Sequence, residues 1–503
     1  MERGIVYEMN MKMFLKICTL VAGIAMAVGM GGCSDELRFT TDMRHRLEFS
    51  TDTVAFDTLF TDVSSATHAF LIYNLNGADM RIAHTTLAGG EQSPYRINVD
   101  GLAGTAHDDL VLRRGDSMYV FVEVTIDPRG KDEPFEANDS VLFVLESGIT
   151  QRVLLTATGQ DATVMRGAVI AHDTHLTGAR PYLIYDSLRV ERGATLTMEP
   201  GTRLYMADGA ELQVHGRIVA QGTPDSLIVM RGARTDRMFA YLPYDRLPAQ
   251  WGGITLHEES TGNVFVHCDI HSGTYGLKAK GTDLTESKLT MHSSQIHNVS
   301  GDALELTMCR GQFTNSLFTN AGGHCVNILG GEMDFIHCTM ANFFPWKSER
   351  GVALHIANYA EEERTIYPLM GVRFINSIIT GAKPDELMGT IVTRTDTADY
   401  SSYAQVAFTH SVINSWREAL DPDTARFKNI VWEHRDSTAY GRTNFRTIDH
   451  TNFVYDFHLD SLSVARRAAS SEYITLIPND KDGMSRTAEG VDAGCYQFFR
   501  IKN

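Results

Sequence analysis

The chain has 503 residues, of which 43% are hydrophobic and 21% charged, and its formal net charge is −17. This composition weighs against a disordered chain, and the length exceeds what one compact core holds, so two or more folding units or one elongated solenoid are expected. The acidic balance weighs against nucleic-acid binding, because an acidic surface repels phosphate backbones.

The amino terminus has the layout of a secretory signal. Lys12 and Lys16 precede an apolar run over 17–30 that ends in two glycines and Cys33. A basic start, a short apolar centre and small residues before the cut are typical of such signals, and the run is too short and too rich in Gly and Ala for a membrane span. The sequence therefore predicts a signal peptide over 1–32; an ordinary signal with a chance cysteine is the alternative reading.

A cysteine at the cut resembles a bacterial lipoprotein signal. That resemblance implies that Cys33 is acylated, palmitate included, and becomes the first residue of a protein anchored by lipid in the outer membrane. The acidic residues that follow Ser34 look like the tag of surface-displayed lipoproteins in Bacteroidetes. We therefore expect 33–46 to be a tether and the membrane to be a partner through the lipid anchor.

Residues 47–160 alternate between apolar and polar positions in short segments. Clusters of Gly, Asn and Asp separate the segments, as at 74–77 and 114–116. Period-two runs bounded by such turns predict a β-sandwich. The segment resembles the immunoglobulin-like repeats of bacterial surface proteins, which implies a spacer or interaction module without chemistry.

A short phrase recurs six times further along the chain: apolar, any, His/Asn/Ser, Ser/Cys, any, apolar, any, small polar. The copies start roughly 22 residues apart, with longer gaps before the last two, and such a period is typical of a repeat architecture. They occupy 265–272, 291–298, 313–320, 335–342, 374–381 and 408–415. Strand-length segments closed by Gly at 193–201 and 209–216 look like entry coils of the same solenoid.

The apolar positions of the phrase cannot all alternate onto one face of a straight strand, so the backbone must bend at the His/Asn position. Short strands that bend into one another form the coil of a β-helix, and coils stack at about 4.8 Å. We predict two interior stacks, which are Phe265, Met291, Phe313, Phe335, Phe374 and Phe408, and Ile270, Ile296, Phe318, Met340, Ile379 and Ile413.

These phrases, with the segments at 201–205 and 250–254, resemble right-handed parallel β-helix proteins of the pectate-lyase-like group, and more closely β-helix lipoproteins of Bacteroidetes. The segments at 456–459 and 492–497 resemble the closing motif of such proteins. The expected fold is all-β, with an immunoglobulin-like β-sandwich over 47–160, a right-handed parallel β-helix over 167–430, and terminal coils and a carboxy-terminal cap over 431–503.

Catalytic residues cannot be assigned from the sequence. Relatives with this fold cleave polysaccharides, but neither the acidic calcium ligands of the lyases nor the paired-Asp motif of the hydrolases transfers to this chain. Only Asp302 and Glu305 are close carboxylates in the repeats, and they need not converge. The cysteines after Cys33 lack the spacing of a disulfide framework or a zinc site. No metal ligand and no cofactor are assigned.

The bend histidines, His267, His337 and His410, are best explained as a column of polar side chains that hydrogen-bond along the stack. A sharper candidate is an outward-facing patch. In the repeat register Asp269 lies under Gln295 and His271 under His297, and such a patch could bind a sugar or a metal.

Trp346, at the start of a long insertion, is the best candidate among the tryptophans for an exposed platform that stacks on a sugar. The sequence thus predicts a non-catalytic display or binding module of the cell envelope, for glycans or other surface polymers, with a polysaccharide or another surface protein as partner. The alternative is a polysaccharide lyase or glycoside hydrolase with an unfamiliar active site.

Overall fold

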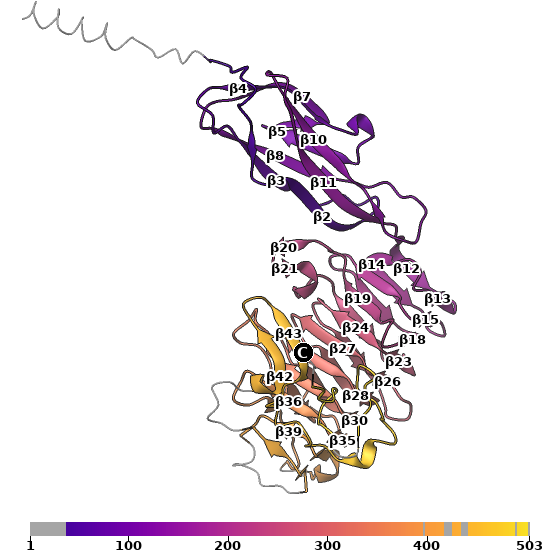
Figure 1. The fold of residues 1–503 in the computed structure, drawn as a ribbon. Coiled ribbons are helices and arrows are strands. Elements are labelled where there is room, and N and C mark those ends of the chain that lie inside the picture. Colours follow the sequence, from indigo (N-terminus) through magenta and orange to yellow (C-terminus); the bar gives the residue numbers. More distant parts are fainter. Residues whose placement is uncertain (1–36, 396–397, 417–424, 434–440, 488–489, 501–503) are drawn as a thin grey trace, which may run out of the picture. The chain divides into compact units, whose positions relative to one another are not determined.

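The computed structural model describes residues 37–395, 398–416, 425–433, 441–487 and 490–500. The predicted signal peptide and Cys33 lie outside these residues. The described chain is all-β apart from short 3-10 turns, and it divides into two compact units, a β-sandwich and a parallel β-helix (Figure 1). In the described ranges, no helix has the length and apolar content to cross a bilayer.

The sandwich consists of two antiparallel sheets with strand orders β1-β3-β8-β5-β6 and β2-β11-β10-β4-β7, and β9 pairs with β11. In β8 every second side chain is buried, as the alternation in the sequence predicts. Phe49 and Phe70 of one sheet contact Phe143 of the other, with ring centroids 5.4 and 6.3 Å apart. The predicted immunoglobulin-like region therefore forms a two-sheet sandwich with an aromatic core.

The strands and the 3-10 turn of this region have the following bounds: β1 Glu48–Phe49, β2 Thr53–Phe60, β3 His68–Tyr73, β4 Met80–Leu87, η1 Gly90–Gln92, β5 Tyr95–Val99, β6 Leu102–Gly104, β7 Ala106–Leu112, β8 Ser117–Val124, β9 Phe135–Glu136, β10 Asp139–Leu145 and β11 Thr150–Gln160.

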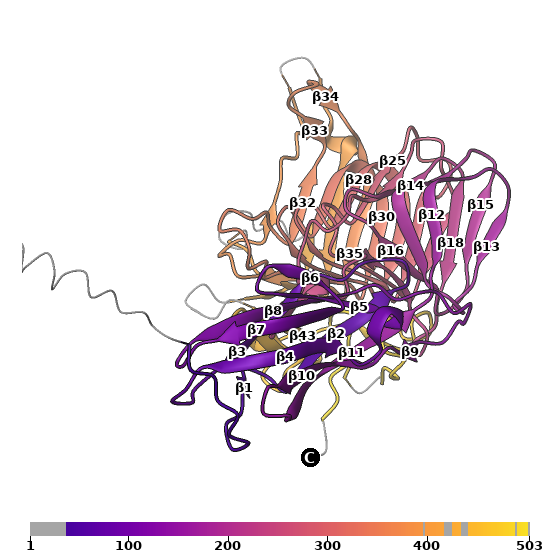
Figure 2. The same cartoon turned by 90° about the horizontal axis from the view of Figure 1, so that it is seen from above.

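The second unit is a parallel β-helix whose strands form one continuous network of 26 strands from β12 to β41. Each strand pairs in parallel with the equivalent strand of the next coil, as β23 does with β26 and β26 with β28. Figure 2 shows the stacked strands from a second direction, with the small β33–β34 hairpin projecting from the coils. Backbone groups that one coil leaves unpaired are satisfied by its neighbours, which is why coils are stable only as a stack.

The elements of the coils and their insertions have the following bounds: β12 Thr163–Ile170, β13 Thr174–Leu176, β14 Tyr182–Val190, β15 Thr195–Met198, β16 Arg203–Met206, β17 Glu211–Val214, β18 Arg217–Gln221, β19 Ile228–Gly232, β20 Arg237–Phe239, β21 Leu242–Pro243, η2 Tyr244–Arg246, β22 Gly253–Leu256, β23 Asn263–Val266, β24 Cys268–His271, β25 Leu277–Lys280, β26 Leu289–His292, β27 Gln295–Val299, β28 Leu304–Thr314, β29 Leu317–Ala321, β30 Val326–Ile336, β31 Thr339–Asn342, β32 Leu354–Ala357, β33 Tyr359–Ala360, β34 Thr365–Ile366, β35 Leu369–Ile375, β36 Ile378–Gly381, β37 Leu387–Met388, η3 Ser401–Tyr403, β38 Ala404–Thr409, β39 Val412–Ile413, β40 Phe427–Lys428 and β41 Val431–Trp432.

Both predicted interior stacks are present. Every member is buried, and the pairing register joins each one to its counterpart in the next coil. The aromatic rings of the first stack lie face to face at centroid distances of 4.4 to 4.9 Å. The repeat therefore specifies both the inward face and the register.

The predicted bend also occurs at the predicted position. His267, Ser293, Asn315, His337, Asn376 and His410 all have a positive φ, between 48° and 53°. Among residues other than glycine, Asn, Asp and His adopt this left-handed conformation most readily. The backbone conformation thus accounts for the Asn and His residues of the phrase.

The next position of the phrase links successive coils by hydrogen bonds. The Ser294 hydroxyl accepts a hydrogen bond from the backbone N–H of Cys268 at 3.0 Å. The Ser377 hydroxyl does the same for Cys338 at 3.1 Å, and the Ser411 hydroxyl for Ser377 at 3.1 Å. The cysteines of the solenoid are free and buried, as the sequence predicts.

A further copy of the repeat escaped the sequence pattern. Phe427 pairs with Phe408, and its ring continues the aromatic stack at 5.0 Å. Asn429 takes the bend position with a φ of 55°, and Trp432 pairs with Ile413. Ile430, in place of the Ser or Cys of the phrase, made this copy hard to recognise.

The carboxy-terminal residues run back along the side of the coils. They contain η4 Arg442–Asn444, β42 Phe445–Asp449, β43 Val454–Leu459 and η5 Ser471–Tyr473, with β42 and β43 forming an antiparallel hairpin. Their side chains Phe445, Phe457, Leu459 and Tyr496 join one apolar cluster with outward-facing residues of later coils, such as Leu317. Val431 and Trp432 still belong to the parallel coils, whereas the described residues 441–487 and 490–500 cover one flank of the solenoid.

Bend residues hold this segment in place. The Asn376 side chain donates a hydrogen bond to the Ser470 carbonyl at 2.9 Å and accepts one from its N–H at 2.8 Å. The Asn315 side chain donates to the Asn479 carbonyl at 2.7 Å. Only part of the polar column bonds along the stack, as Asn376 does with His337 at 3.0 Å. The bend residues therefore hydrogen-bond along the stack, as predicted, and also hold the carboxy-terminal segment.

Candidate functional site

The candidate patch lies on two neighbouring strands that follow the bend, β24 and β27. Cys268 and Ile270 face inward, so Asp269 and His271 share the outer face of β24. Parallel pairing places Gln295 beside Asp269 and His297 beside His271. The register derived from the repeat is thus confirmed at these four residues.

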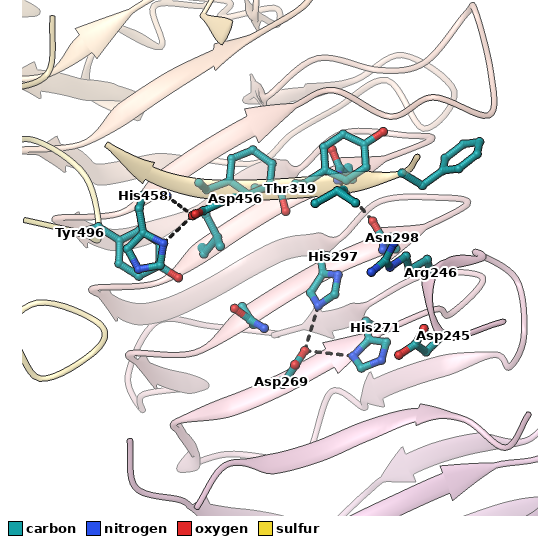
Figure 3. Close-up of a pocket in the computed structure, with 17 residues that line it drawn as sticks. Asp245, Arg246, Asp269, His271, His297, Asn298, Thr319, Asp456, His458 and Tyr496 are labelled. Carbon is teal, nitrogen blue, oxygen red and sulfur yellow. Dashed lines mark hydrogen bonds and ion pairs between the residues drawn. The ribbon is translucent and has the colours of Figure 1, made fainter. Parts of the chain in front are cut away.

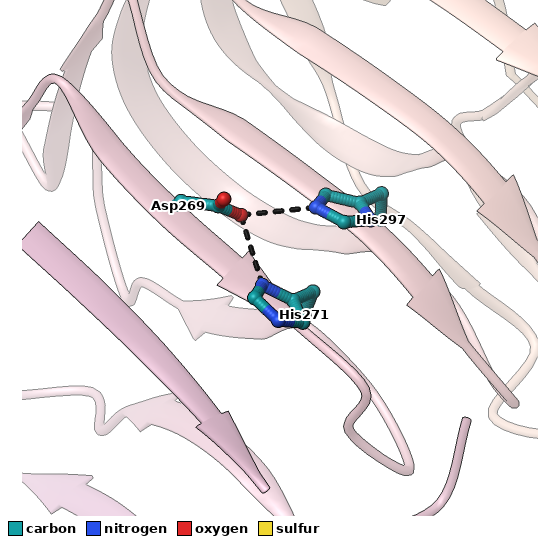
Figure 4. A group of neighbouring side chains, drawn as sticks. All are labelled: Asp269, His271 and His297. Carbon is teal, nitrogen blue, oxygen red and sulfur yellow. Dashed lines mark hydrogen bonds and ion pairs between the residues drawn. The ribbon is translucent and has the colours of Figure 1, made fainter. Parts of the chain in front are cut away.

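Asp269, His271 and His297 form one hydrogen-bonded group (Figure 4). The same carboxylate oxygen of Asp269 lies 3.0 Å from Nδ1 of His271 and 3.0 Å from Nε2 of His297. The two imidazole rings are stacked, with centroids 4.8 Å apart and planes 16° from parallel. One carboxylate therefore accepts hydrogen bonds from histidines of two successive coils.

Burial changes the protonation of this group. Burial by itself would raise the pKa of Asp269, but the attraction and hydrogen bonds of His271 and His297 outweigh it and hold that pKa well below its usual range. Burial lowers the pKa of His271 in spite of the neighbouring carboxylate. At neutral pH the group therefore consists of an ionised carboxylate beside a neutral His271.

The patch is less exposed than the sequence suggested. The side chains of His271, Asp269 and His297 are 8%, 17% and 23% exposed. They form the floor of a pocket of about 380 Å³ whose opposite wall is residues 453–458 (Figure 3). The patch faces outward from the coil, as predicted, and the hairpin β42–β43 covers this flank of the solenoid.

The opposite wall carries a second charged group. His458 lies 2.5 Å from Asp456 through Nδ1 and 2.7 Å from Asp482 through Nε2. Its ring stacks on Tyr496 with a centroid distance of 4.0 Å. Burial by itself would lower the pKa of His458, but the two carboxylates raise it to about 9. This histidine is therefore an imidazolium at neutral pH.

Trp346 does not line the pocket, but it stacks on Phe453, which does. The two rings are 4.3 Å apart and parallel to within 1°. Tyr241 also stacks on Phe453, with ring centroids 6.5 Å apart, and Phe239 stacks on Tyr241 at 5.7 Å. We call Phe239, Tyr241, Phe453 and Trp346 the aromatic row. Three of these side chains are strongly exposed: Phe239 at 52%, Tyr241 at 51% and Trp346 at 39%.

Sequence reasoning missed the wall and most of the row. Phe453, Asp456, His458 and Tyr496 lie outside the repeats. The segments at 456–459 and 492–497 were interpreted only as a closing motif, and Phe453 belongs to neither. The pattern Asp-x-His at 456–458 repeats the Asp-x-His at 269–271 and was the one available signal. Nothing in the sequence indicates that the two segments lie on opposite walls of one pocket.

The isolated carboxylates of the repeats have structural partners. Asp302 accepts hydrogen bonds from the backbone N–H of His324 at 2.6 Å and from the Asn327 side chain at 2.7 Å. Glu305 forms an ion pair with Lys278 at 3.6 Å. These contacts explain both carboxylates without a catalytic role.

No protein-family model matches the sequence. A stretch of 70 residues is 40% identical to protein bark beetle of Drosophila melanogaster, and the match covers 14% of this chain and 2% of the length of that relative. A match of this extent does not assign the chain to a family.

Three solved structures match parts of the chain, each with a TM-score of 0.17. A PapD-like domain of human CEP192 is 12% identical and covers 26% of this chain and 96% of its own. A family 123 glycoside hydrolase from Clostridium perfringens is 8% identical, and the match covers 22% of this chain and 25% of that one. A protein of unknown function from Porphyromonas gingivalis is 12% identical, and the match covers 26% of this chain and 57% of that one.

Proposed function

We propose that this protein is a non-catalytic binding module of the cell envelope that holds a glycan against one flank of its β-helix. The aromatic row, which leads to the pocket, is the observation that carries the proposal. Exposed, stacked aromatic side chains are unusual on a soluble surface and mark binding sites. Aromatic faces pack against the apolar faces of sugar rings, and the polar floor offers hydrogen-bond partners to sugar hydroxyls.

The resemblance to right-handed β-helix proteins of the pectate-lyase-like group supports a polysaccharide as the ligand class. The charge of the pocket fits a neutral or basic glycan better than an acidic one. Its lining carries three carboxylates, Asp245, Asp269 and Asp456, against two cations, Arg246 and the imidazolium of His458.

The test is a binding titration of the purified protein with neutral, basic and acidic polysaccharides. Trp346→Ala and Phe453→Ala should each weaken binding by at least about tenfold, the loss expected when a stacked aromatic anchor is removed. Tyr119→Ala is the matched control, since Tyr119 is 55% exposed and stacks on Phe121 at 5.7 Å, but lies in the sandwich. Binding that survives both variants would refute the site.

The same incubations test the alternative that the protein is a polysaccharide lyase or hydrolase. New reducing or unsaturated ends would show turnover and would refute a binding-only role. Retention of the polymer without new ends is the expected result.

The anchor is a separate part of the proposal. Cys33, behind an apolar stretch and two glycines, supports acylation and display on the outer membrane. Cells that express the protein should incorporate radiolabelled palmitate into it, and Cys33→Ala should abolish the label. An unlabelled wild-type protein would refute the anchor and leave the glycan site untouched.

A further inference from the structure

We propose that Asp269, His271 and His297 bind a divalent transition-metal ion, such as Zn²⁺, at the floor of the pocket. In the described part of the chain, this is the one group of three or more His, Cys, Asp and Glu side chains whose ligand atoms converge, all within 4.8 Å of one another. Two imidazole nitrogens and one carboxylate oxygen are a donor set that such ions prefer over Ca²⁺ or Mg²⁺.

The distances fit a shared ion. Ligand bonds of about 2.1 Å place neighbouring ligand atoms about 3.0 Å apart in an octahedral site and about 3.4 Å apart in a tetrahedral one. The carboxylate oxygen of Asp269 is 3.0 Å from each of the two nitrogens, Nδ1 of His271 and Nε2 of His297. The two nitrogens lie within 4.8 Å of each other, so side-chain rotations that replace the two hydrogen bonds would bring all three atoms onto one ion.

Metal binding needs neutral rings with their protons on the outer nitrogens, Nε2 of His271 and Nδ1 of His297. Asp245, which lines the same pocket, lies on the side of the His271 ring opposite Asp269 in Figure 3. One of its carboxylate oxygens is buried without a hydrogen-bond partner among the described residues, while the other pairs with Arg231 at 3.2 Å. A carboxylate orients a metal-bound imidazole when it accepts a hydrogen bond from the outer ring nitrogen, and no such bond joins Asp245 to His271 in the described residues.

The backbone around the site is fixed by the coil. The Trp251 indole donates a hydrogen bond to the His271 carbonyl at 2.8 Å, and this indole is almost fully buried. β24 and β27 are central strands, each paired on both sides. Three protein ligands on rigid strands leave the remaining positions of the ion open towards the pocket, as in metal sites that bind an exchangeable molecule.

A second histidine pair supplies a matched control. His324 and His355 are also stacked at 4.8 Å, with planes 20° from parallel. His355 faces the Asn327 side chain at 2.9 Å, where His271 faces a carboxylate. The nearby Asp302 carboxylate bonds to the His324 backbone and to Asn327, and not to either ring. Because no carboxylate oxygen of the described residues converges with the two ring nitrogens here, substitution at this pair should leave metal binding unchanged.

The test is a titration of the purified protein, stripped with chelator and without glycan, with Zn²⁺ by calorimetry and with Co²⁺ by absorption spectroscopy. Wild type and His355→Gln should each bind one equivalent, and the bound Co²⁺ should show the visible bands of nitrogen and oxygen ligation. Asp269→Asn and His297→Gln should each weaken binding by at least about tenfold. His297, the most exposed of the three ligands, is the substitution least disruptive to folding.

Three outcomes would overturn the proposal. They are a wild type that binds no stoichiometric Zn²⁺, a His355→Gln variant that loses as much Zn²⁺ affinity as the ligand variants, and a His297→Gln variant that keeps the wild-type affinity for Zn²⁺. Because the titration contains no sugar, its result is independent of glycan binding. If the protein binds Zn²⁺ but no polysaccharide, the metal site stands and the proposed glycan-binding function is refuted. If it binds polysaccharide but no Zn²⁺, the glycan-binding function stands and the metal site is refuted.

Discussion

Phe313 and Phe335 lie face to face in successive coils, with ring centroids 4.4 Å apart and ring planes 6° from parallel. Both side chains are completely buried, and Phe374 continues the stack on the far side of Phe335. Phe335 therefore contacts an aromatic ring on each face, and no neighbouring side chain can move in to fill its place without breaking the stack.

Phe335→Ala should lower the free energy of unfolding by about 3–5 kcal/mol, because it removes buried apolar area and leaves a cavity between two rings. Urea denaturation followed by circular dichroism measures the change. Phe239→Ala, at a side chain that is 52% exposed, should stay within about 0.5 kcal/mol of wild type. Equal stability of Phe335→Ala and wild type would show that the ring is not inside the coil.

At the bend position a glycine variant should be more stable than an alanine variant, which reverses their usual order of stability. His410 has a φ of 50° and bonds to Asn429 at 2.8 Å, so His410→Gly and His410→Ala lose the same hydrogen bond. His410→Gly should nevertheless be more stable by about 1 kcal/mol, because a Cβ is strained in this conformation. At Thr290, inside β26, alanine should be the more stable of the two. Thermal melting of the four variants decides between these orders.

His458 should make stability depend on pH above neutrality. Its pKa is about 9 in the folded chain, where hydrogen bonds to Asp456 and Asp482 outweigh burial, and about 6.5 when unfolded. The folded state then keeps a proton that the unfolded state releases, so this contribution is complete below about pH 6.5 and is lost as the pH rises through about 9.

Melting temperatures measured from about pH 6 to pH 10 test this linkage. The difference between wild type and His458→Gln should be largest at the acidic end and should vanish at the alkaline end. Burial raises the pKa of Glu386 to about 8, so this group also makes stability fall as the pH rises, in both proteins. The test therefore compares the difference in melting temperature between the two proteins. A constant difference across the range would contradict the shifted pKa.

Arg486 should hold the carboxy-terminal segment on the solenoid. Its buried guanidinium donates hydrogen bonds to Asn315 at 2.9 Å and to the Gly494 carbonyl at 3.1 Å. Arg486→Met keeps most of the side-chain volume but leaves these acceptors unpaired, which costs about 1–3 kcal/mol for each buried group. Limited proteolysis should cut 470–487 faster in this variant, whereas Arg466→Met, at a more exposed position, should be cut at the wild-type rate.

The repeat determined more than the class of fold. In a stack of parallel coils, equal positions in the phrase become neighbours in space, so the register of Asp269 with Gln295 and of His271 with His297 followed from the alignment alone. The same rule supplied the interior stacks and the bend. The coil of Phe427 was missed because Ile430 departs from the Ser/Cys position of the phrase and the preceding segment has no repeat character.

The sequence alone thus determined the sandwich, the solenoid, the inward face of each coil and the floor of the pocket, because these depend on short-range periodicity and on pairing between adjacent coils. Only the tertiary structure decided that the floor is covered, that His458 and Tyr496 oppose it, and that Phe453 joins Trp346 to the pocket. These contacts join segments far apart in the chain through one non-repeating apolar cluster. Their geometry depends on the fit of particular side chains, and no periodic pattern encodes that fit.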